Sequence, residues 1–316
     1  MNKNKKSLFQ IQTKNINNIK LNLLQFISHS IGKNITKVRQ IFVKTKLHFG
    51  NQIFFLSNII FYCEILKCKR IILEKNRYSF IKNTIINKKY KMKIEVGNIN
   101  SLKYYDTLID NTCNFYYYNK YLKTESRISL LRKEIYNNLP KVSIDINDLY
   151  IYIRSGDIFT KKRPNNIYLQ PPLCFYMKVI NDYNFKQIFL ISENNKNPVI
   201  NALLKSFPYI SYKKNSLKLD IAKLVNTYNI AGGGISTFFY NILSLNVKLK
   251  NLWIFQFNHL PFNLINLRKI DIKNNINNYV MNATKDYINK MYPWRNSKMQ
   301  RKLMINYKCT KCCFIN

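Results

Sequence analysis

The chain of 316 residues is long enough for two domains, and its 47% hydrophobic content excludes an intrinsically disordered protein. Its 52 basic and 15 acidic residues give a net charge of +37, which favours anionic partners such as phosphate-bearing ligands or nucleic acid. The lysines are spread along the whole chain, however, and the favoured residues Lys, Asn, Ile, Tyr and Phe share A/T-rich codons. We therefore favour compositional bias over dedicated nucleic-acid binding.

The first half of the chain predicts a polar extension followed by strands that alternate with helices. The extension covers residues 1–40, and its first 20 residues lack the apolar stretch of a signal peptide. No run of about 18 uncharged apolar residues predicts a transmembrane span. The apolar run at 53–63 is shorter and favours a buried helix. The expected elements are a strand near 41–47, a turn at 48–52, a helix through Lys67, strands at 70–74 and 92–96, and an amphipathic helix at 125–139.

The second half is more regular and begins after Pro140 and a polar stretch that marks a domain boundary. Short apolar runs alternate with helical patterns, which predicts parallel strands joined by crossover helices. The expected strands are 149–153, 187–192, 209–213, 229–234 and 251–255, the last of the series, and the expected helices begin near Pro171, Pro198, Leu217 and Ser236.

The seven cysteines predict no disulfide framework, and their odd number leaves at least one thiol unpaired within the chain. The terminal Cys309, Cys312 and Cys313 resemble half a zinc site. No second Cys or His pair lies near them in the sequence, so we expect a frayed tail with surface thiols and no metal site.

Two loops in the second half have residues suited to an anion. Arg154 follows an apolar strand directly, within the sequence YIRSGD, so it should lie at the carboxyl edge of a sheet. Arginine suits bidentate contact with phosphate, Gly156 permits a tight turn, and Ser155 and Asp157 can hold the loop by hydrogen bonds. An equally good interpretation from these residues alone is an Arg154–Asp157 ion pair that only closes the turn.

The second loop has the sequence AGGGIST and leads from a strand into a helix. Gly234, Ser236 and Thr237 would offer backbone N–H groups and hydroxyls at the helix N-terminus, which is a suitable site for an anion. The spacing matches neither of the common nucleotide-binding glycine patterns, so an ordinary capped turn remains the alternative. A third loop, in the first half, has the amides of Asn51 and Gln52 beside Gly50 in a strand-to-helix turn.

In this order, the three loops resemble the motifs of the fucosyltransferase superfamily, which includes α-1,2-, α-1,6- and protein O-fucosyltransferases. FGNQIFF resembles the opening Gly-Asn-Gln turn, YIRSGD the His-x-Arg-x-Gly-Asp motif, and DIAKLVNTYNIAGGGISTF the late Asp…Ser-Thr-Phe motif. YLQPPLCFY and LISENNKNPVINAL are also similar to segments expected between these motifs. The resemblance covers residues from about 48 to 255.

The resemblance implies a GT-B-type glycosyltransferase, with two Rossmann-like domains of parallel sheets flanked by helices that face a cleft. It divides the chain into the extension (1–40), an acceptor-side domain (41–147), a nucleotide-sugar-binding domain (148–260) and a C-terminal helical segment and tail (261–316). The reaction would transfer fucose from GDP-fucose to a glycan or protein acceptor with inversion, and would need neither metal nor cofactor. The compartment stays open between the Golgi or secretory lumen and the cytoplasm.

The resemblance also implies roles for individual residues. Arg154 would hold the β-phosphate of the donor and offset the charge of departing GDP. Asp220 would accept hydrogen bonds from guanine or ribose. The remaining donor ligands would be Asn51, Gln52, Gly234, Ser236, Thr237 and Phe238.

The chain departs from the family pattern at Tyr152, where the motif has a histidine, and this departure puts catalytic activity in question. A general base for the acceptor hydroxyl would be Asp157 or Glu193, since both follow strands and need only hydrogen-bond reach. We favour structural pairing with Arg154 for Asp157 and a solvated position for Glu193. Three other hypotheses remain: a related transferase with another sugar nucleotide, a basic anion- or nucleic-acid-binding protein, and a transferase-like protein that binds glycans without turnover.

Overall fold

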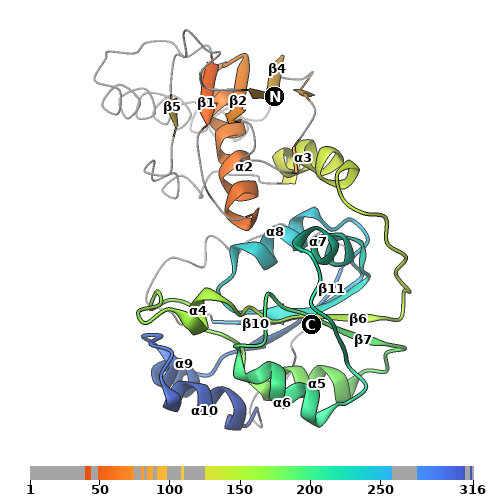
Figure 1. Cartoon of the computed structure of the whole chain (residues 1–316), viewed down its shortest axis with the longest axis vertical. Helices are drawn as coiled ribbons and strands as arrows, with labels where there is room; N and C mark the ends of the chain where they lie inside the picture. Colours follow the sequence, from red (N-terminus) through yellow and green to blue (C-terminus); the bar gives the residue numbers. More distant parts are fainter. Residues whose placement is uncertain are drawn as a thin grey trace, which may run out of the picture. The chain divides into compact units, whose positions relative to one another are not determined.

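The computed structural model describes residues 40–43, 49–74, 80–81, 84–87, 91–97, 108–109, 125–257, 276–309 and 314. The chain divides into two compact units, Met1–Asn138 (unit 1) and Leu139–Asn316 (unit 2). Each unit has its own sheet and its own helices, so the protein belongs to the α/β class (Figure 1). The predicted class is therefore confirmed, and the two sheets are consistent with two Rossmann-like domains. The predicted extension lies outside the described residues, except for Gln40.

Unit 1 contains a mixed five-stranded sheet in the order β3-β4-β2-β1-β5. Strand β1 pairs in parallel with β2 and β5, β2 pairs in parallel with β4, and β3 is an antiparallel edge strand. The elements are β1 (Gln40–Val43), α2 (Phe49–Leu66), β2 (Arg70–Glu74), β3 (Ile85–Asn87), β4 (Met92–Gly97), β5 (Leu108–Ile109) and α3 (Glu125–Asn137).

Helix α2 is apolar on all sides and forms part of the core of unit 1. Its residues Ile53, Leu56, Ile59 and Ile60 are buried, as expected of a helix whose apolar residues extend beyond a single stripe. The helix begins at Phe49 and has 18 residues, so it is longer than the apolar run in the sequence. By length and composition it qualifies as a candidate membrane span, but 76% of its apolar window is buried inside the protein. Such burial is typical of a core helix.

Unit 2 contains a six-stranded sheet in which every pair of neighbouring strands is parallel. When the six strands are numbered along the chain, so that β6 is strand 1 and β11 is strand 6, their order across the sheet from β8 to β11 is 3-2-1-4-5-6. This is the strand order of a doubly wound dinucleotide-binding fold. The elements are β6 (Leu149–Tyr152), α4 (Asp157–Thr160), α5 (Leu173–Asp182), β7 (Ile188–Ile191), α6 (Pro198–Ser206), β8 (Ser211–Tyr212), α7 (Leu217–Asn226), β9 (Asn229–Gly233), α8 (Thr237–Leu245), β10 (Asn251–Gln256), β11 (Asn277–Asn282), α9 (Lys285–Met291) and α10 (Lys298–Asn306).

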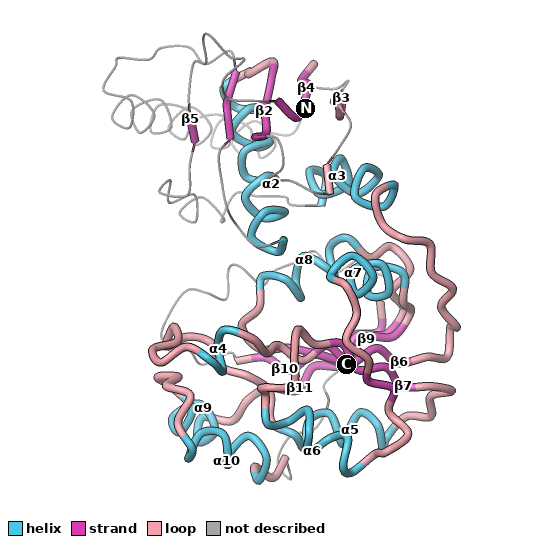
Figure 2. Tube along the Cα trace, in the orientation of Figure 1, coloured by secondary structure: helices cyan, strands magenta, loops and turns pink. Residues whose placement is uncertain are grey.

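Helices cover both faces of this sheet. Figure 2 shows α7 and α8 on one face, and α5, α6, α9 and α10 on the other. All residues of β6 and β9 are buried, because a central parallel strand is covered on both sides. For the same reason these strands appear in the sequence as continuous apolar or small-residue runs, which explains why they were predictable.

Side-chain caps begin several helices of unit 2, and the cap at Ser236 was predicted from the sequence. Asn197 caps α6 by accepting a hydrogen bond from the N–H of Val199 at 3.0 Å, and Pro198 occupies the first helical position. Ser236 caps α8 by accepting a hydrogen bond from the N–H of Phe239 at 3.3 Å. These caps are local interactions, so the sequence alone can predict them.

Two predictions for the C-terminal part of the chain are wrong. The strand at 251–255 is not the last one, because β11 follows it and pairs with β10 in parallel. Only Met281 of β11 is fully buried, so no apolar run marks this strand. Cys309 is not a surface thiol, because it forms a disulfide with Cys174 of α5 across a sequence separation of 135. Sequence spacing cannot predict a pairing over this separation.

Candidate functional site

The candidate site lies at the carboxyl edge of the sheet of unit 2, between β6 and β9. These strands are neighbours and parallel, and the strand order reverses between them. The Arg154 loop (residues 153–156) follows β6, and the Ser236 loop (residues 234–236) follows β9. In open parallel sheets, ligands bind at the carboxyl ends of the strands where the order reverses. The two loops predicted to bind an anion therefore meet at the expected place in the fold.

Tyr152 joins the two loops. Its hydroxyl oxygen lies 3.4 Å from the hydroxyl oxygen of Ser236, and the two share a hydrogen bond. The Tyr152 ring stacks on Phe239 with centroids 5.4 Å apart and also contacts Phe238 at 5.2 Å. Burial raises the pKa of Tyr152, although the nearby Arg154 and the hydrogen bond with Ser236 lower it in part. The hydroxyl is therefore neutral at physiological pH and acts as a hydrogen-bonding group.

Two carboxylates hold Arg154. Its guanidinium forms an ion pair with Asp157 and another with Glu193, the latter at 2.9 Å. Burial lowers the pKa of Arg154, but Tyr152 and the two carboxylates raise it, and the net shift is upward. The ion pair with Asp157 is the structural arrangement that the sequence left open, and Glu193 is a partner that the sequence did not predict. A phosphate group at Arg154 would have to replace at least one of these carboxylates.

Buried and partly buried hydrogen bonds hold the backbone of the Arg154 loop. The hydroxyl of Ser155 donates to the side-chain oxygen of Asn194 at 2.7 Å and accepts from the N–H of Asn197 at 2.9 Å. The side-chain N–H of Asn197 donates to the carbonyl of Arg154 at 2.9 Å. Ser155 therefore holds the loop as predicted, whereas Asn194 and Asn197 come from the β7–α6 connection and were not predicted as site residues.

Gly156 suits its position because its φ of 71° lies in the left-handed region, which residues with a Cβ rarely adopt. An added Cβ would also meet the carboxylate of Glu193, which is the end of a flexible side chain. The carboxylate of Glu193 thus occupies the space directly over the turn, beside Arg154. Because 56% of the Glu193 side chain is exposed, it can move into solvent when another anion binds.

The Ser236 loop is held more tightly than predicted. We expected free backbone N–H groups, but the N–H of Ile235 donates to the carbonyl of Leu169 at 3.1 Å and the N–H of Gly234 to Phe255 at 3.4 Å. Gly234 has a φ of 78°, and an added Cβ would lie 2.8 Å from the Leu169 carbonyl. The hydroxyl of Ser236 likewise has partners within the protein, because it accepts from the N–H of Phe239 and shares a hydrogen bond with Tyr152.

Gln170 is a buried polar residue of the site that the sequence did not single out. Its side-chain N–H donates to the carbonyl of Leu169 at 2.9 Å, and the side chain lies against Gly234. Its side-chain oxygen is buried and has no hydrogen-bond partner within the described residues. The Tyr287 hydroxyl donates to the Gln170 carbonyl at 2.9 Å, so α9 holds this segment against the Ser236 loop.

The other predicted ligands lie elsewhere. Asp220 lies in the first turn of α7, where it accepts a hydrogen bond from Asn215 at 3.0 Å, and burial raises its pKa. No described contact joins it to Arg154 or Ser236. Asn51 and Gln52 belong to unit 1 and lie within the first turn of α2, so the turn predicted for them is wrong.

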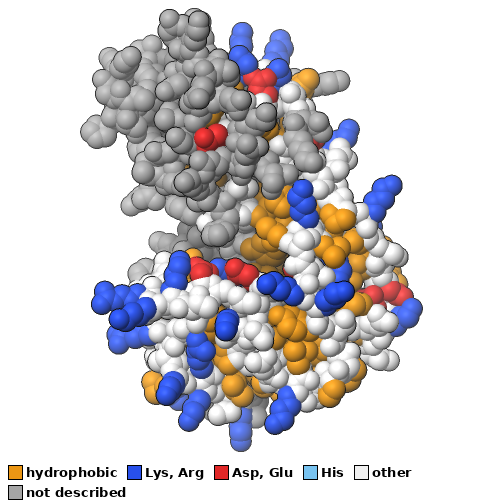
Figure 3. All heavy atoms as spheres, viewed as in Figure 1, with side chains coloured by type: hydrophobic (Ala, Val, Ile, Leu, Met, Phe, Trp, Pro, Cys, Tyr) orange, Lys and Arg blue, Asp and Glu red, His pale blue; other side chains and the backbone are white. Residues whose placement is uncertain are grey.

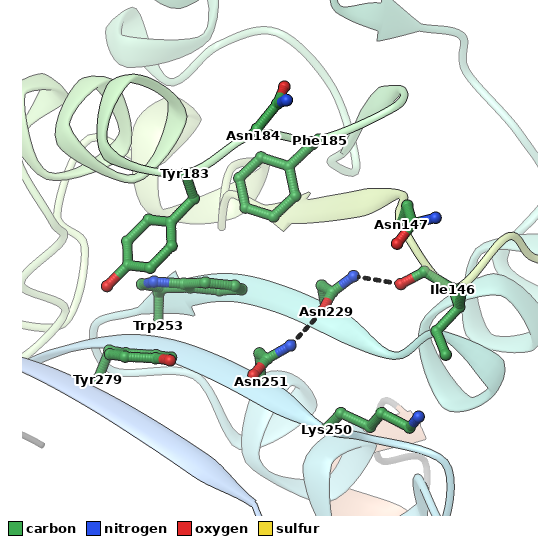
Figure 4. Close-up of a pocket in the computed structure, with 10 residues that line it drawn as sticks. All are labelled: Ile146, Asn147, Tyr183, Asn184, Phe185, Asn229, Lys250, Asn251, Trp253 and Tyr279. Carbon is green, nitrogen blue, oxygen red and sulfur yellow. Dashed lines mark hydrogen bonds between the residues drawn. The ribbon is translucent and has the colours of Figure 1, made fainter.

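A pocket of about 410 Å³ lies beside the Arg154 loop. A second pocket, of about 280 Å³, lies at the opposite, amino edge of the sheet (Figure 4). The second pocket is lined by Ile146, Asn147, Tyr183, Asn184, Phe185, Asn229, Lys250, Asn251, Trp253 and Tyr279.

Asparagines at the amino edge form a row of hydrogen bonds across the sheet. Asn277 donates to Asn251 at 2.8 Å, Asn251 donates to Asn229 at 2.7 Å, and Asn229 donates to the carbonyls of Ile146 and Asp148. Figure 4 shows the bonds that join Asn251, Asn229 and Ile146. These amides satisfy one another, so the row joins the starts of four strands. We assign it a structural role.

Basic side chains are spread over the visible face of unit 2 and do not gather in one patch (Figure 3). Among the described residues, no group of three or more His, Cys, Asp or Glu side chains is placed to hold a metal ion. Comparisons with protein-family models, curated proteins and solved structures found no match to this chain.

Proposed function

We propose that the protein is a glycosyltransferase that moves fucose from GDP-fucose to a hydroxyl group of a glycan or protein acceptor, with inversion and without a metal ion. The observation that carries the proposal is the hydrogen bond between Tyr152 and Ser236. It joins an arginine loop and a serine-capped helix at the reversal point of a parallel sheet. A pyrophosphate between these loops would contact both the guanidinium and the α8 N-terminus.

Arg154 would bind the β-phosphate after an exchange of anions. In the unliganded protein its charge is balanced by Asp157 and Glu193. Asp157 is also paired with Lys161 at 3.2 Å, whereas Glu193 is more exposed and has no second cation among the residues that the structure describes. Glu193 is therefore the carboxylate that would leave, and the phosphate would take its place over Gly156.

During transfer, the acceptor oxygen would form a bond to the anomeric carbon of fucose while the bond from that carbon to the β-phosphate oxygen breaks. The electron pair would go to GDP, where Arg154 offsets the developing charge. The proton of the acceptor hydroxyl would go to a carboxylate, for which Asp157 and Glu193 are the candidates within reach of the loop. The roles of Thr237, Phe238 and Asp220 in holding GDP, and those of Asn51 and Gln52, stay predictions.

Calorimetric titration of the full chain with GDP, UDP and ADP tests the proposal. We expect GDP to bind best, and Arg154→Ala to weaken GDP binding about tenfold or more, because a charge-assisted pair is lost. Arg295→Ala is the matched control, since Arg295 is exposed and belongs to the same unit. Equal GDP affinity in wild type and Arg154→Ala would refute the assignment.

One observation favours a second function, binding without turnover. Tyr152 stands where the resembled family has a histidine, and its buried, neutral hydroxyl is already used by Ser236. A protein that binds GDP and GDP-fucose but neither hydrolyses nor transfers fucose would have this second function. Incubation with GDP-fucose and a mixture of glycan and protein acceptors, followed by measurement of released GDP, separates the two functions.

A further inference from the structure

The pocket beside the Arg154 loop is separate from the site proposed for the nucleotide. It lies over the connection from α4 to α5, and its volume of about 410 Å³ falls within the range of about 300–1,000 Å³ for small-molecule sites. It is lined by Asp157, Ile158, Lys161, Arg163, Pro164, Asn165 and Tyr168. Neither Gly234 nor Ser236 lines it, so a pyrophosphate between the two loops would leave it open.

The C-terminal part of the chain holds the walls of this pocket in place. Trp294 donates from its indole N–H to the carbonyl of Ile158 at 3.2 Å, and from its backbone N–H to the carbonyl of Asn166 at 2.8 Å. Asn296 and Arg301 both donate to the carbonyl of Phe159, at 3.0 Å and 2.8 Å. The pocket is therefore a built feature of unit 2, with walls tied to the α9–α10 connection.

The pocket carries positive charge that its own carboxylate does not neutralise. Asp157 is the one acidic residue in the lining, and it is already paired with Arg154 and Lys161. Arg163 is exposed and forms no ion pair within the described part of the chain. The side-chain oxygen of Asn165 accepts a hydrogen bond from the N–H of Ile167 at 3.2 Å, whereas its side-chain N–H group has no hydrogen-bond partner among the described residues. The lining thus offers a guanidinium and an amide donor to an anion.

The pocket also lies next to the proposed reaction centre. Asp157 both lines the pocket and forms an ion pair with Arg154, and Tyr168, another residue of the lining, lies close enough to raise the pKa of Arg154. A molecule in this pocket would therefore be adjacent to the leaving group of the proposed transfer.

We propose that this pocket binds the acceptor, and that the acceptor is a saccharide with an anionic group, such as a carboxylate, that pairs with Arg163. The proposal rests on the proposed function, because it takes Arg154 as the donor site. Arg163 is then a specificity-determining residue. It would distinguish acidic from neutral acceptors by a charge-assisted hydrogen bond, while Tyr168 offers an aromatic side chain to the sugar ring.

The test compares two sugars that differ in one group. Methyl β-glucuronide and methyl β-glucoside are titrated onto the full chain at saturating GDP, with wild type, Arg163→Gln and Lys162→Gln. Lys162 is the matched control, because it is exposed and adjacent to Arg163 but does not line the pocket. We expect the wild type to bind the glucuronide about tenfold more tightly, the effect of one charge-assisted hydrogen bond. Arg163→Gln should lose this preference and Lys162→Gln should keep it.

Three results would overturn the proposal. They are equal binding or non-binding of the two sugars, a preference that survives Arg163→Gln, and a preference that both variants lose, which would indicate only the diffuse positive field of the protein. A further arm adds sodium sulfate to the wild type with glucuronide. If sulfate displaces the glucuronide with an affinity equal to that of the glucuronide itself, the pocket is a site for free anions and the acceptor assignment fails.

The two proposals fail in different ways. GDP titration of the same wild-type protein tests the donor site and does not depend on the sugars. If GDP does not bind, the proposed function fails, and the sugar titrations without GDP still decide whether the pocket selects acidic saccharides. If GDP binds and no acidic preference is found, the acceptor inference alone is wrong.

Discussion

The hydroxyl oxygens of Tyr152 and Ser236 lie 3.4 Å apart, although the residues are 84 positions apart in the sequence. Tyr152 ends β6 and Ser236 begins α8, so this contact connects two loops that only the pairing of β6 with β9 brings together. The Tyr152 ring is stacked on Phe239, the residue whose N–H the Ser236 hydroxyl accepts. Packing and hydrogen bonding therefore hold the same pair of loops in one arrangement.

Removal of the Tyr152 hydroxyl should lower the free energy of unfolding slightly and the affinity for GDP more strongly. For Tyr152→Phe we expect the free energy of unfolding to fall by about 1 kcal/mol, because one buried hydrogen bond is lost while the ring stack remains. GDP affinity should fall as well, since Ser236 loses a partner that orients it. Urea denaturation and GDP calorimetry measure the two effects. Tyr209→Phe is the control, because Tyr209 is 66% exposed, and an equal loss in both variants would contradict the prediction.

Glu193 should compete with a bound phosphate. The substitution Glu193→Gln removes the carboxylate that lies over Gly156 and pairs with Arg154. We expect GDP affinity to rise, by about three- to tenfold, because the incoming phosphate no longer displaces an anion. Asp182→Asn on α5 is the control for the change in net charge, since Asp182 forms a surface ion pair with Lys178. A weaker affinity in Glu193→Gln would show that Glu193 instead positions Arg154 for the ligand.

The substitution Asp220→Asn should raise the stability of the fold and lower the affinity for GDP. Burial raises the pKa of its carboxyl in the folded protein, so folding favours the protonated form. The free-energy cost of ionising the buried carboxyl is absent at low pH and appears as the pH rises through the raised pKa. Asp220→Asn should therefore be more stable than wild type at pH 7 and equally stable near pH 3. If Asp220 binds guanine or ribose, the same variant should lose GDP affinity.

Thermal unfolding at the two pH values and GDP calorimetry at pH 7 check this prediction. Asp286→Asn is the control, because Asp286 is an exposed partner of Lys290 on α9 and should change neither quantity. A gain in stability without a loss of GDP affinity would confine Asp220 to a structural role.

The row of asparagines at the amino edge should contribute to stability in proportion to burial. Asn229 donates to two carbonyls of the segment before β6 and accepts from Asn251. Asn229→Ala should lower the free energy of unfolding by about 2–4 kcal/mol, because it leaves buried polar groups without partners. Asn277→Ala, at the exposed end of the same row, should cost less than about 1 kcal/mol. Denaturant titration measures both values, and equal losses would mean that the row does not act through burial.

Much of unit 2 was predictable from local patterns. Strands such as β6 and β9 are covered on both faces, so they appear as apolar or small-residue runs, and the caps Asn197 and Ser236 bond to residues only two or three positions away. Strand β11 was missed because most of its residues are only partly buried. In unit 1, the turn predicted at Gly50–Gln52 belongs to α2, because burial of the surrounding apolar residues extends the helix to Phe49.

The partners of the site residues depend on the tertiary structure. The sequence placed Arg154 at a sheet edge and allowed an ion pair with Asp157, three residues away. It placed Glu193 just beyond a strand but contained no signal for the ion pair of Glu193 with Arg154, for the hydrogen bond between Ser155 and Asn194, or for the disulfide between Cys174 and Cys309. Short-range periodicity and capping depend on neighbours along the chain and can be read from it, whereas the order of the strands decides which distant side chains meet, and only the packed sheet of unit 2 sets that order.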